Sequence, residues 1–175
     1  MIKLDPMKYK KRHSNLGLHP LVKAAFATIA ATALLIGPSF AQHEVEFHPD
    51  KRHHVSVVGA GTYVYEEDYT AATVGIDYEY RVSPLLGVGF VAEHAFGRVD
   101  ATTLLAVADI HVWRGLAVQT GPGIEIIDGE VFAAGRIGAL YEFELKDHWT
   151  FSPQVHFDIS EENAIVFGAA FGRAF

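Results

Sequence analysis

Residues 163–175 read N-A-I-V-F-G-A-A-F-G-R-A-F and end on an aromatic residue. Ile165, Phe167, Ala169, Phe171 and Phe175 share one side of this stretch, and the positions between them are nearly all small. A period of two predicts a β-strand. Large residues on one face and glycine or alanine on the other suit a narrow cylinder that is apolar outside and crowded within.

The same alternation recurs upstream of this strand. Segments of about ten to thirteen alternating residues are separated by short breaks rich in Pro, Gly, Asp or Glu. Each break is short enough for an antiparallel hairpin, and no amphipathic helix pattern interrupts the series. We therefore predict an all-β fold, an eight-stranded antiparallel up-and-down barrel, with strands at His54–Tyr65, Thr70–Arg81, Leu86–Phe96, Ala101–Trp113, Gly115–Ile127, Glu130–Leu145, Trp149–Ile159 and Asn163–Phe175.

One face of most strands is apolar and the other polar. A soluble lipocalin-like barrel would turn the apolar face inward, whereas a transmembrane barrel turns it outward. The polar face mixes arginines with many carboxylates and carries no lysine, which indicates an enclosed network rather than a solvated surface. Strands of about ten residues, tilted by about 40°, also match an outer-membrane hydrocarbon band of about 25 Å. The first strand is the least regular, and Gly59 and Gly61 could mark a bulge.

Aromatic residues gather near the strand ends on the side where the chain ends. Membrane interfaces recruit such girdles of rings. The girdle predicted from the sequence comprises Tyr78, Tyr80, Trp113, Tyr141, Phe143, Trp149, Phe151, Phe171 and Phe175.

The front of the chain is a separate segment. Six basic residues and one acid precede the apolar run Ala24–Gly37, which is followed by Pro38 and Ser39-Phe40-Ala41. The run has 14 residues, too few for a spanning helix of about 20. We predict a secretory signal peptide over residues 1–41, cut after Ala41, with translation starting at Met1 or Met7.

Removing this segment changes the charge balance. It takes six of the 14 basic and one of the 21 acidic side chains, leaving 8 and 20, a net charge near −12 with His neutral. A basic footprint for nucleic acid is therefore absent. The chain has no Cys, which excludes disulfides and thiolate metal sites.

Residues 42–53 form a leader without periodicity, placed in the periplasm. His43, His48, His53 and His54 lie in or beside it among three acids. Imidazoles and carboxylates can bind divalent metal, but no fixed ligand spacing is visible. We interpret the segment as a polar leader, expect no cofactor, and keep these four histidines as weak metal candidates.

The signal peptide, the eight hairpin-linked strands and the final F-G-R-A-F together resemble the small outer-membrane β-barrels of the OmpA/OmpX-like superfamily. The resemblance covers about Val55 to Phe175. It implies an outer-membrane location in a Gram-negative-type cell, lipid contacts, a monomer, and recognition of the carboxy-terminal Phe by the barrel-assembly machinery. It also places both chain ends in the periplasm, and the outward loops are short for this family, which disfavours a large receptor surface.

Charged residues on the inner face are expected to fill the lumen, because an eight-stranded cylinder is just wide enough for its own side chains. Arg136 is the predicted hub, paired with some of Asp77, Glu93, Asp109 and Asp158, and Arg81 is expected to pair with Glu79, Glu142 or Glu144. The predicted lumen network is Asp77, Glu79, Arg81, Glu93, Asp109, His111, Arg136, Glu142, Glu144, His156 and Asp158, with Gln119, Glu125 and Gln154 beside it.

Three function classes are compatible with this lumen. A structural envelope barrel with a charged plug is the main interpretation, and a narrow, acid-lined, cation-favouring or gated pore is the alternative. A lipid-modifying enzyme is the third, but Ser152 and His156 would lie roughly 13 Å apart on one strand, too far for a nucleophile and its base. His94 is expected at the rim, and we predict no catalytic site.

Overall fold

The computed structural model describes residues 49–65 and 68–175, and the predicted signal peptide and most of the leader lie outside this range. The described chain is a single antiparallel sheet. Within it, no helix is long and apolar enough to cross a bilayer. The elements are β1 (His53–Val64), β2 (Tyr69–Arg81), β3 (Leu86–Ala95), β4 (Ala101–Trp113), β5 (Leu116–Ile127), β6 (Glu130–Tyr141), β7 (Phe143–Glu144), the 3-10 turn η1 (Lys146–His148), β8 (Trp149–Ile159) and β9 (Ala164–Ala174).

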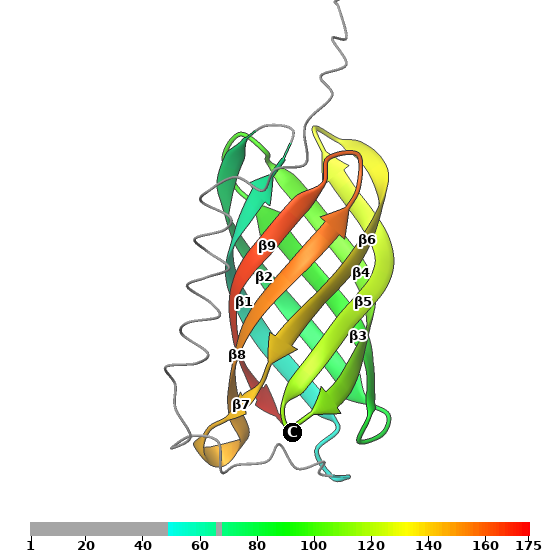
Figure 1. The fold of residues 1–175 in the computed structure, drawn as a ribbon, viewed down its shortest axis with the longest axis vertical. Helices are drawn as coiled ribbons and strands as arrows, with labels where there is room; N and C mark the ends of the chain where they lie inside the picture. The colour runs from blue at the N-terminus through cyan, green and yellow to red at the C-terminus, as the bar shows by residue number, and fades with distance from the viewer. Residues whose placement is uncertain (1–48, 66–67) are drawn as a thin grey trace, which may run out of the picture. The chain divides into compact units, whose positions relative to one another are not determined.

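The sheet closes on itself. Consecutive strands pair from β1 to β6, both β6 and β7 pair with β8, and β8 pairs with β9. β9 in turn pairs with β1, from His54↔Ala174 to Val64↔Ala164 (Figure 1). Two backbone hydrogen bonds join His53 to Phe175 at the seam. The predicted eight-stranded antiparallel barrel is confirmed, with the terminal strand pairing to the first as its closing element. Closure leaves no edge strand with unpaired amides.

Two tight hairpins come from turns that the sequence encodes locally. Asp128 and Gly129 have φ of 51° and 82°, and Arg114 and Gly115 have φ of 38° and 84°. A type I′ turn requires positive φ at both central residues, and its twist matches that of the flanking strands. These two-residue loops fix the register of β5 against β4 and β6.

The sixth predicted strand, Glu130–Leu145, is a correction. This segment forms two strands, β6 and β7, which are interrupted at Glu142. Both strands pair with β8 in one continuous register, from Leu140↔Gln154 to Phe143↔Phe151. The gap falls opposite Pro153 and Ser152. Pro153 has no amide hydrogen to donate, so the ladder weakens there.

The expected bulge at Gly59 and Gly61 is also wrong. β1 keeps an unbroken register against both β2 and β9. The register shift lies instead between His111 and Trp113, where β4 leaves β5.

The barrel is apolar outside and polar inside. Val57, Ile76 and Phe90 are more than half exposed on the outer face, whereas Gln119 and Arg136 are 1% and 3% exposed within. Large apolar groups normally avoid water, and charged groups are rarely buried. The arrangement is therefore inverted relative to a soluble protein.

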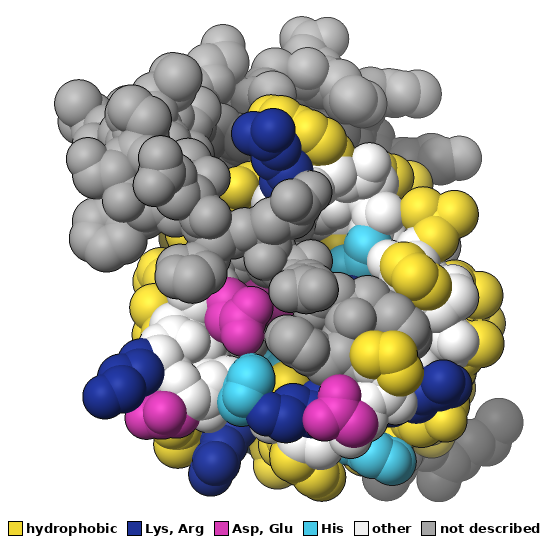
Figure 2. Space-filling view, turned by 90° about the horizontal axis from the view of Figure 1, so that it is seen from below, with side chains coloured by type: hydrophobic (Ala, Val, Ile, Leu, Met, Phe, Trp, Pro, Cys, Tyr) yellow, Lys and Arg dark blue, Asp and Glu magenta, His cyan; other side chains and the backbone are white. Residues whose placement is uncertain are grey.

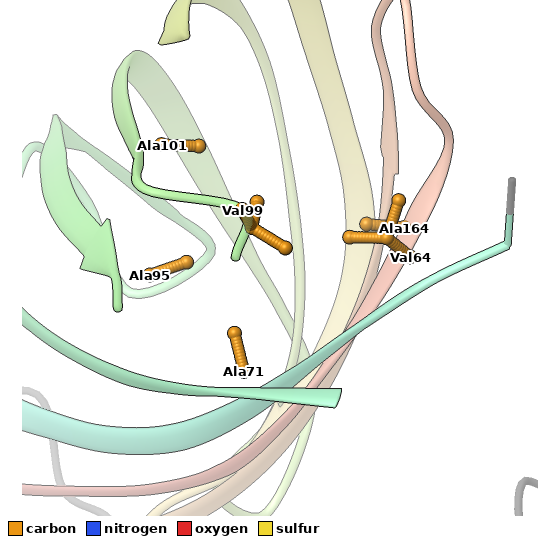
Figure 3. Packing of buried hydrophobic residues seen from close by; sticks show 6 residues of the cluster. All are labelled: Val64, Ala71, Ala95, Val99, Ala101 and Ala164. Atoms are coloured by element: carbon orange, nitrogen blue, oxygen red, sulfur yellow. The ribbon is translucent and has the colours of Figure 1, made fainter. Parts of the chain in front are cut away.

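The lumen is not polar throughout, which corrects the sequence-based expectation of a purely charged plug. At the loop end, Val99 from the β3–β4 loop folds over the mouth against Val64 and Ala164 (Figure 3). This apolar cap comprises Val64, Ala71, Ala95, Val99, Ala101 and Ala164. Deeper in the lumen, Val91, Leu105 and Val107 form a second buried apolar group.

Candidate functional site

The centre of the lumen is an ion-pair hub on Arg136 of β6. Its Nε and Nη2 donate to Asp158 at 2.7 and 2.7 Å, and its Nη1 and Nη2 donate to Glu93 at 3.1 and 2.6 Å. Arg136 and Glu93 are 3% and 4% exposed. The planar guanidinium binds two carboxylates in bidentate fashion, which is the geometry that fixes both partners. The hub therefore ties together β3, β6 and β8 across the barrel.

Asp77 and Asp109 are joined by an amide rather than by Arg136. The Nε2 of Gln119 donates to Asp77 Oδ2 at 3.1 Å and to Asp109 Oδ1 at 3.0 Å. Among the described residues, no cation lies within 4.0 Å of either carboxylate. Two acidic side chains beside the hub therefore share one amide donor.

A third cluster lies towards the end where the chain terminates. Arg81 lies 2.7 Å from Glu79 and 3.4 Å from Glu142, and Nε2 of His111 lies 2.7 Å from the same oxygen of Glu79. Nε2 of His54 is 2.7 Å from Thr150 Oγ1 and 3.9 Å from Glu142 Oε2. Seen from this end, histidines and acids lie among basic side chains (Figure 2).

A small cavity adjoins this terminal-side cluster. It leaves about 20 Å³ for the centre of a water-sized sphere, which is room for about one water molecule. Most of its lining residues are polar, and they come from β1, β2, β4, β6, β8 and β9 and from Glu142 between β6 and β7. The lining residues are His54, Ser56, Asp77, Glu79, Asp109, His111, Leu140, Glu142, Ser152, Gln154 and Ala170.

Comparison with known proteins supports the fold. No protein-family model matches the sequence, and the search of curated proteins found no relative. Among solved structures, the N-terminal β-barrel domain of Pseudomonas aeruginosa OprF is similar with 15% identity over 70% of this chain and 97% of that one, at a TM-score of 0.54. A de novo designed transmembrane β-barrel is similar with 16% identity over 72% of this chain and 99% of that one, at a TM-score of 0.50.

The chain has the fold of the small outer-membrane β-barrels. The attachment invasion locus protein Ail of Yersinia pestis is a further similar chain, with 13% identity over 70% of this chain and 98% of that one, at a TM-score of 0.49. At identities this low, the similarity to OprF and to the designed barrel shows the fold alone.

Most of the predicted lumen residues of this outer-membrane-type barrel point inward, in three groups. Arg136 meets Glu93 and Asp158, but not Asp77 or Asp109. Arg81 meets Glu79 and Glu142, but not Glu144, which lies at the rim 3.3 Å from His148. The sequence offered Glu144 as an alternative partner of Arg81, and it is not used because η1 turns the chain at the rim and brings His148 to Glu144.

His156 is buried in the lumen, 2% exposed, and its Nδ1 has no hydrogen-bond partner. It lies opposite Gly138 on β6. A Cβ at Gly138 would overlap the imidazole, so the glycine makes the space that the ring fills. Glu125 lies nearer the loop end and accepts a hydrogen bond from Ser160.

Rings at the chain-terminus end contact one another on the outer face. Tyr78 packs on Phe90 with ring centroids 5.3 Å apart, and Trp149 stacks on Phe171 at 5.0 Å. Arg173, which breaks the apolar alternation of the terminal strand, lies over the Trp149 ring at 5.6 Å. The remaining girdle contacts join Tyr141 to Phe143, and Tyr80 and Phe175 to His53.

Two of the four candidate metal histidines lie among the described residues. His43 and His48 lie outside the described residues. His53 lies on the outer face, bonded to the Tyr78 hydroxyl at 2.8 Å, whereas His54 points into the lumen. The strand begins at His53, so adjacent histidines face opposite sides.

His94 and Glu93 are likewise adjacent but on opposite faces. His94 contacts Thr102 Oγ1 at 3.0 Å and Asp100 at 3.4 Å near the loop-end rim, while Glu93 joins the central hub. The predicted rim position of His94 agrees with this placement.

Sequence reasoning missed three features. The apolar cap depends on Val99, a loop residue that no alternation pattern covers. The lumen role of His54 was obscured because this residue lies at the boundary between the polar leader and the first predicted strand. A second set of rings lies at the loop end, where Tyr63 and Tyr65 are 5.3 Å apart; their position on the strand could have shown it.

Proposed function

We propose that this chain is an integral outer-membrane protein with a structural envelope role, whose lumen is closed by the Arg136 hub and the apolar cap. The observation that carries the proposal is the inverted polarity: apolar side chains cover the outer face, and an ion-paired Arg136 that is 3% exposed lies inside. In hydrocarbon, a closed barrel satisfies every backbone group and an apolar exterior costs nothing.

The hub supports a structural rather than a conducting role. Its four short hydrogen bonds connect β3, β6 and β8 and leave little space around the guanidinium. At the loop end, the apolar cap packs across the mouth of the lumen. An ion crossing the barrel would have to displace both barriers.

Membrane fractionation tests the location. The full chain should migrate with the outer-membrane fraction and shift its gel mobility on boiling, because a folded barrel resists the detergent until heated. Recovery in the soluble periplasm with an unshifted band would refute the proposal.

A narrow cation-favouring pore is the second candidate, and the acid-lined cavity at the terminal side favours it. Surplus carboxylates would attract cations and exclude anions. This function requires the hub and the cap to open together.

Planar-bilayer recording separates the two functions. The structural proposal expects silence from the native protein and from Arg136→Ala, because the cap still blocks the mouth. Arg81→Ala serves as the matched control, since it removes a lumen arginine outside the hub. Cation-selective steps in the native protein would refute the closed-lumen role, and silence in all three would refute the pore.

A further inference from the structure

The terminal-side cluster combines groups that are also metal ligands. His54, Glu79 and Glu142 each offer one ligand atom, and these three atoms all lie within 4.8 Å of one another. His54 lies on β1, Glu79 on β2 and Glu142 between β6 and β7, so closure of the barrel brings the three side chains together. The three residues are far apart in the sequence, so no metal-binding motif with a fixed spacing predicts them.

We propose that these three side chains bind a divalent transition metal ion, with His111 positioning Glu79. In a tetrahedral zinc site with bonds of about 2.0–2.1 Å, neighbouring ligand atoms lie about 3.3 Å apart. Nε2 of His54 and Oε2 of Glu142 are already 3.9 Å apart. Small side-chain rotations therefore suffice to close the set around an ion.

His111 supplies the support that such sites need. Its Nε2 lies 2.7 Å from Glu79 Oε1, and hydrogen bonds to ligating carboxylates hold them in place and tune the ion. The adjoining cavity has room for about one water, which provides a fourth ligand. One imidazole with two carboxylates favours zinc, nickel or copper over magnesium, which prefers an all-oxygen shell.

Arg81 is the native competitor for this site. Its guanidinium lies within 3.4 Å of both carboxylates, and its side chain is 12% exposed at the rim. The same negative charge thus attracts either the arginine or a dication. When a dication binds, the flexible arginine side chain can withdraw towards the rim, and the two carboxylates neutralise the ion.

The test is to titrate zinc into the full chain folded in detergent micelles and to measure binding by calorimetry. The absorption spectrum of bound cobalt reports the coordination geometry of the ion. One zinc per barrel is expected, with no comparable magnesium binding. His54→Ala and Glu142→Gln should weaken zinc binding by more than about 100-fold, and His111→Ala by about 10-fold to 100-fold. Arg81→Gln should tighten it by about tenfold, because a competing charge is removed.

Two control variants separate this site from other histidines. His94→Ala, on the outer face, should leave zinc affinity unchanged. His43→Ala with His48→Ala, in the leader, should also leave one tight site. Loss of zinc binding in the leader variant, or equal affinity in His54→Ala and the native protein, would overturn the proposal. The heat-shifted gel band of each variant shows whether it is folded. A folded Arg81→Gln variant whose zinc affinity is unchanged or weaker would also contradict the proposal.

Discussion

Replacing Arg136 with Met should be among the most damaging single changes in the lumen. The guanidinium is 3% exposed and donates four hydrogen bonds to Glu93 and Asp158. Methionine fills much of the volume but leaves two buried carboxylates without a cation. Removing one partner of a buried ion pair typically costs about 3–5 kcal/mol. We therefore expect the free energy of unfolding to fall by that amount, a factor of about 10²–10⁴ in the folding equilibrium.

The assay is urea unfolding of barrels folded into lipid vesicles, followed by tryptophan fluorescence. Trp113 and Trp149 are the chain's two tryptophans, and both lie on the outer face near the chain-terminus end, where unfolding moves them from lipid to water. Gel mobility before and after boiling gives an independent folded fraction.

Two further variants identify the cause. Arg81→Met should cost less, about 1–2 kcal/mol, because His111 still lies 2.7 Å from Glu79 and the cavity beside Glu79 and Glu142 has room for about one water molecule. Adding Glu93→Gln and Asp158→Asn to Arg136→Met should recover at least half of the loss, since no unpaired charge remains. A loss below about 1 kcal/mol in the single variant, or a triple variant as unstable as the single one, would refute the reasoning.

Three other changes test the backbone and the cap by the same unfolding assay. Gly121→Ala should lower the free energy of unfolding by about 1–3 kcal/mol, because the added Cβ would overlap the carbonyl oxygen of Ala106. Gly59→Ala is the control, because a Cβ at Gly59 would have no neighbouring atom within 4 Å. Equal losses in the two variants would contradict this explanation. Gly129→Val should cost about 1–3 kcal/mol, because a φ of 82° strains a branched residue; an unchanged midpoint would argue against the I′ turn. Val99→Asp should cost about 1–3 kcal/mol by placing a carboxylate in the apolar cap, whereas exposed Arg98→Gln should change little, and a similar small effect of both would show that the cap does not stabilise the barrel.

The sequence alone was sufficient to predict the architecture of this protein. Alternation with a period of two marked eight strands, and short breaks such as Asp128-Gly129 marked the hairpins between them. The absence of lysine from the polar faces indicated that these faces turn inward. These are local signals, because a strand's two faces and a turn's backbone angles depend on neighbouring residues in the chain.

Only the tertiary structure decided which inward groups meet. Arg136 had four candidate acids on four strands. The barrel's register selected Glu93 and Asp158, while Gln119 joined Asp77 to Asp109. Register and barrel curvature set these distances, and neither is encoded by any single strand. The same closure brings His54 of β1 close to Glu142, between β6 and β7. Residues far apart in the chain become neighbours because the cylinder is narrow, and for that reason the candidate metal site has no sequence motif.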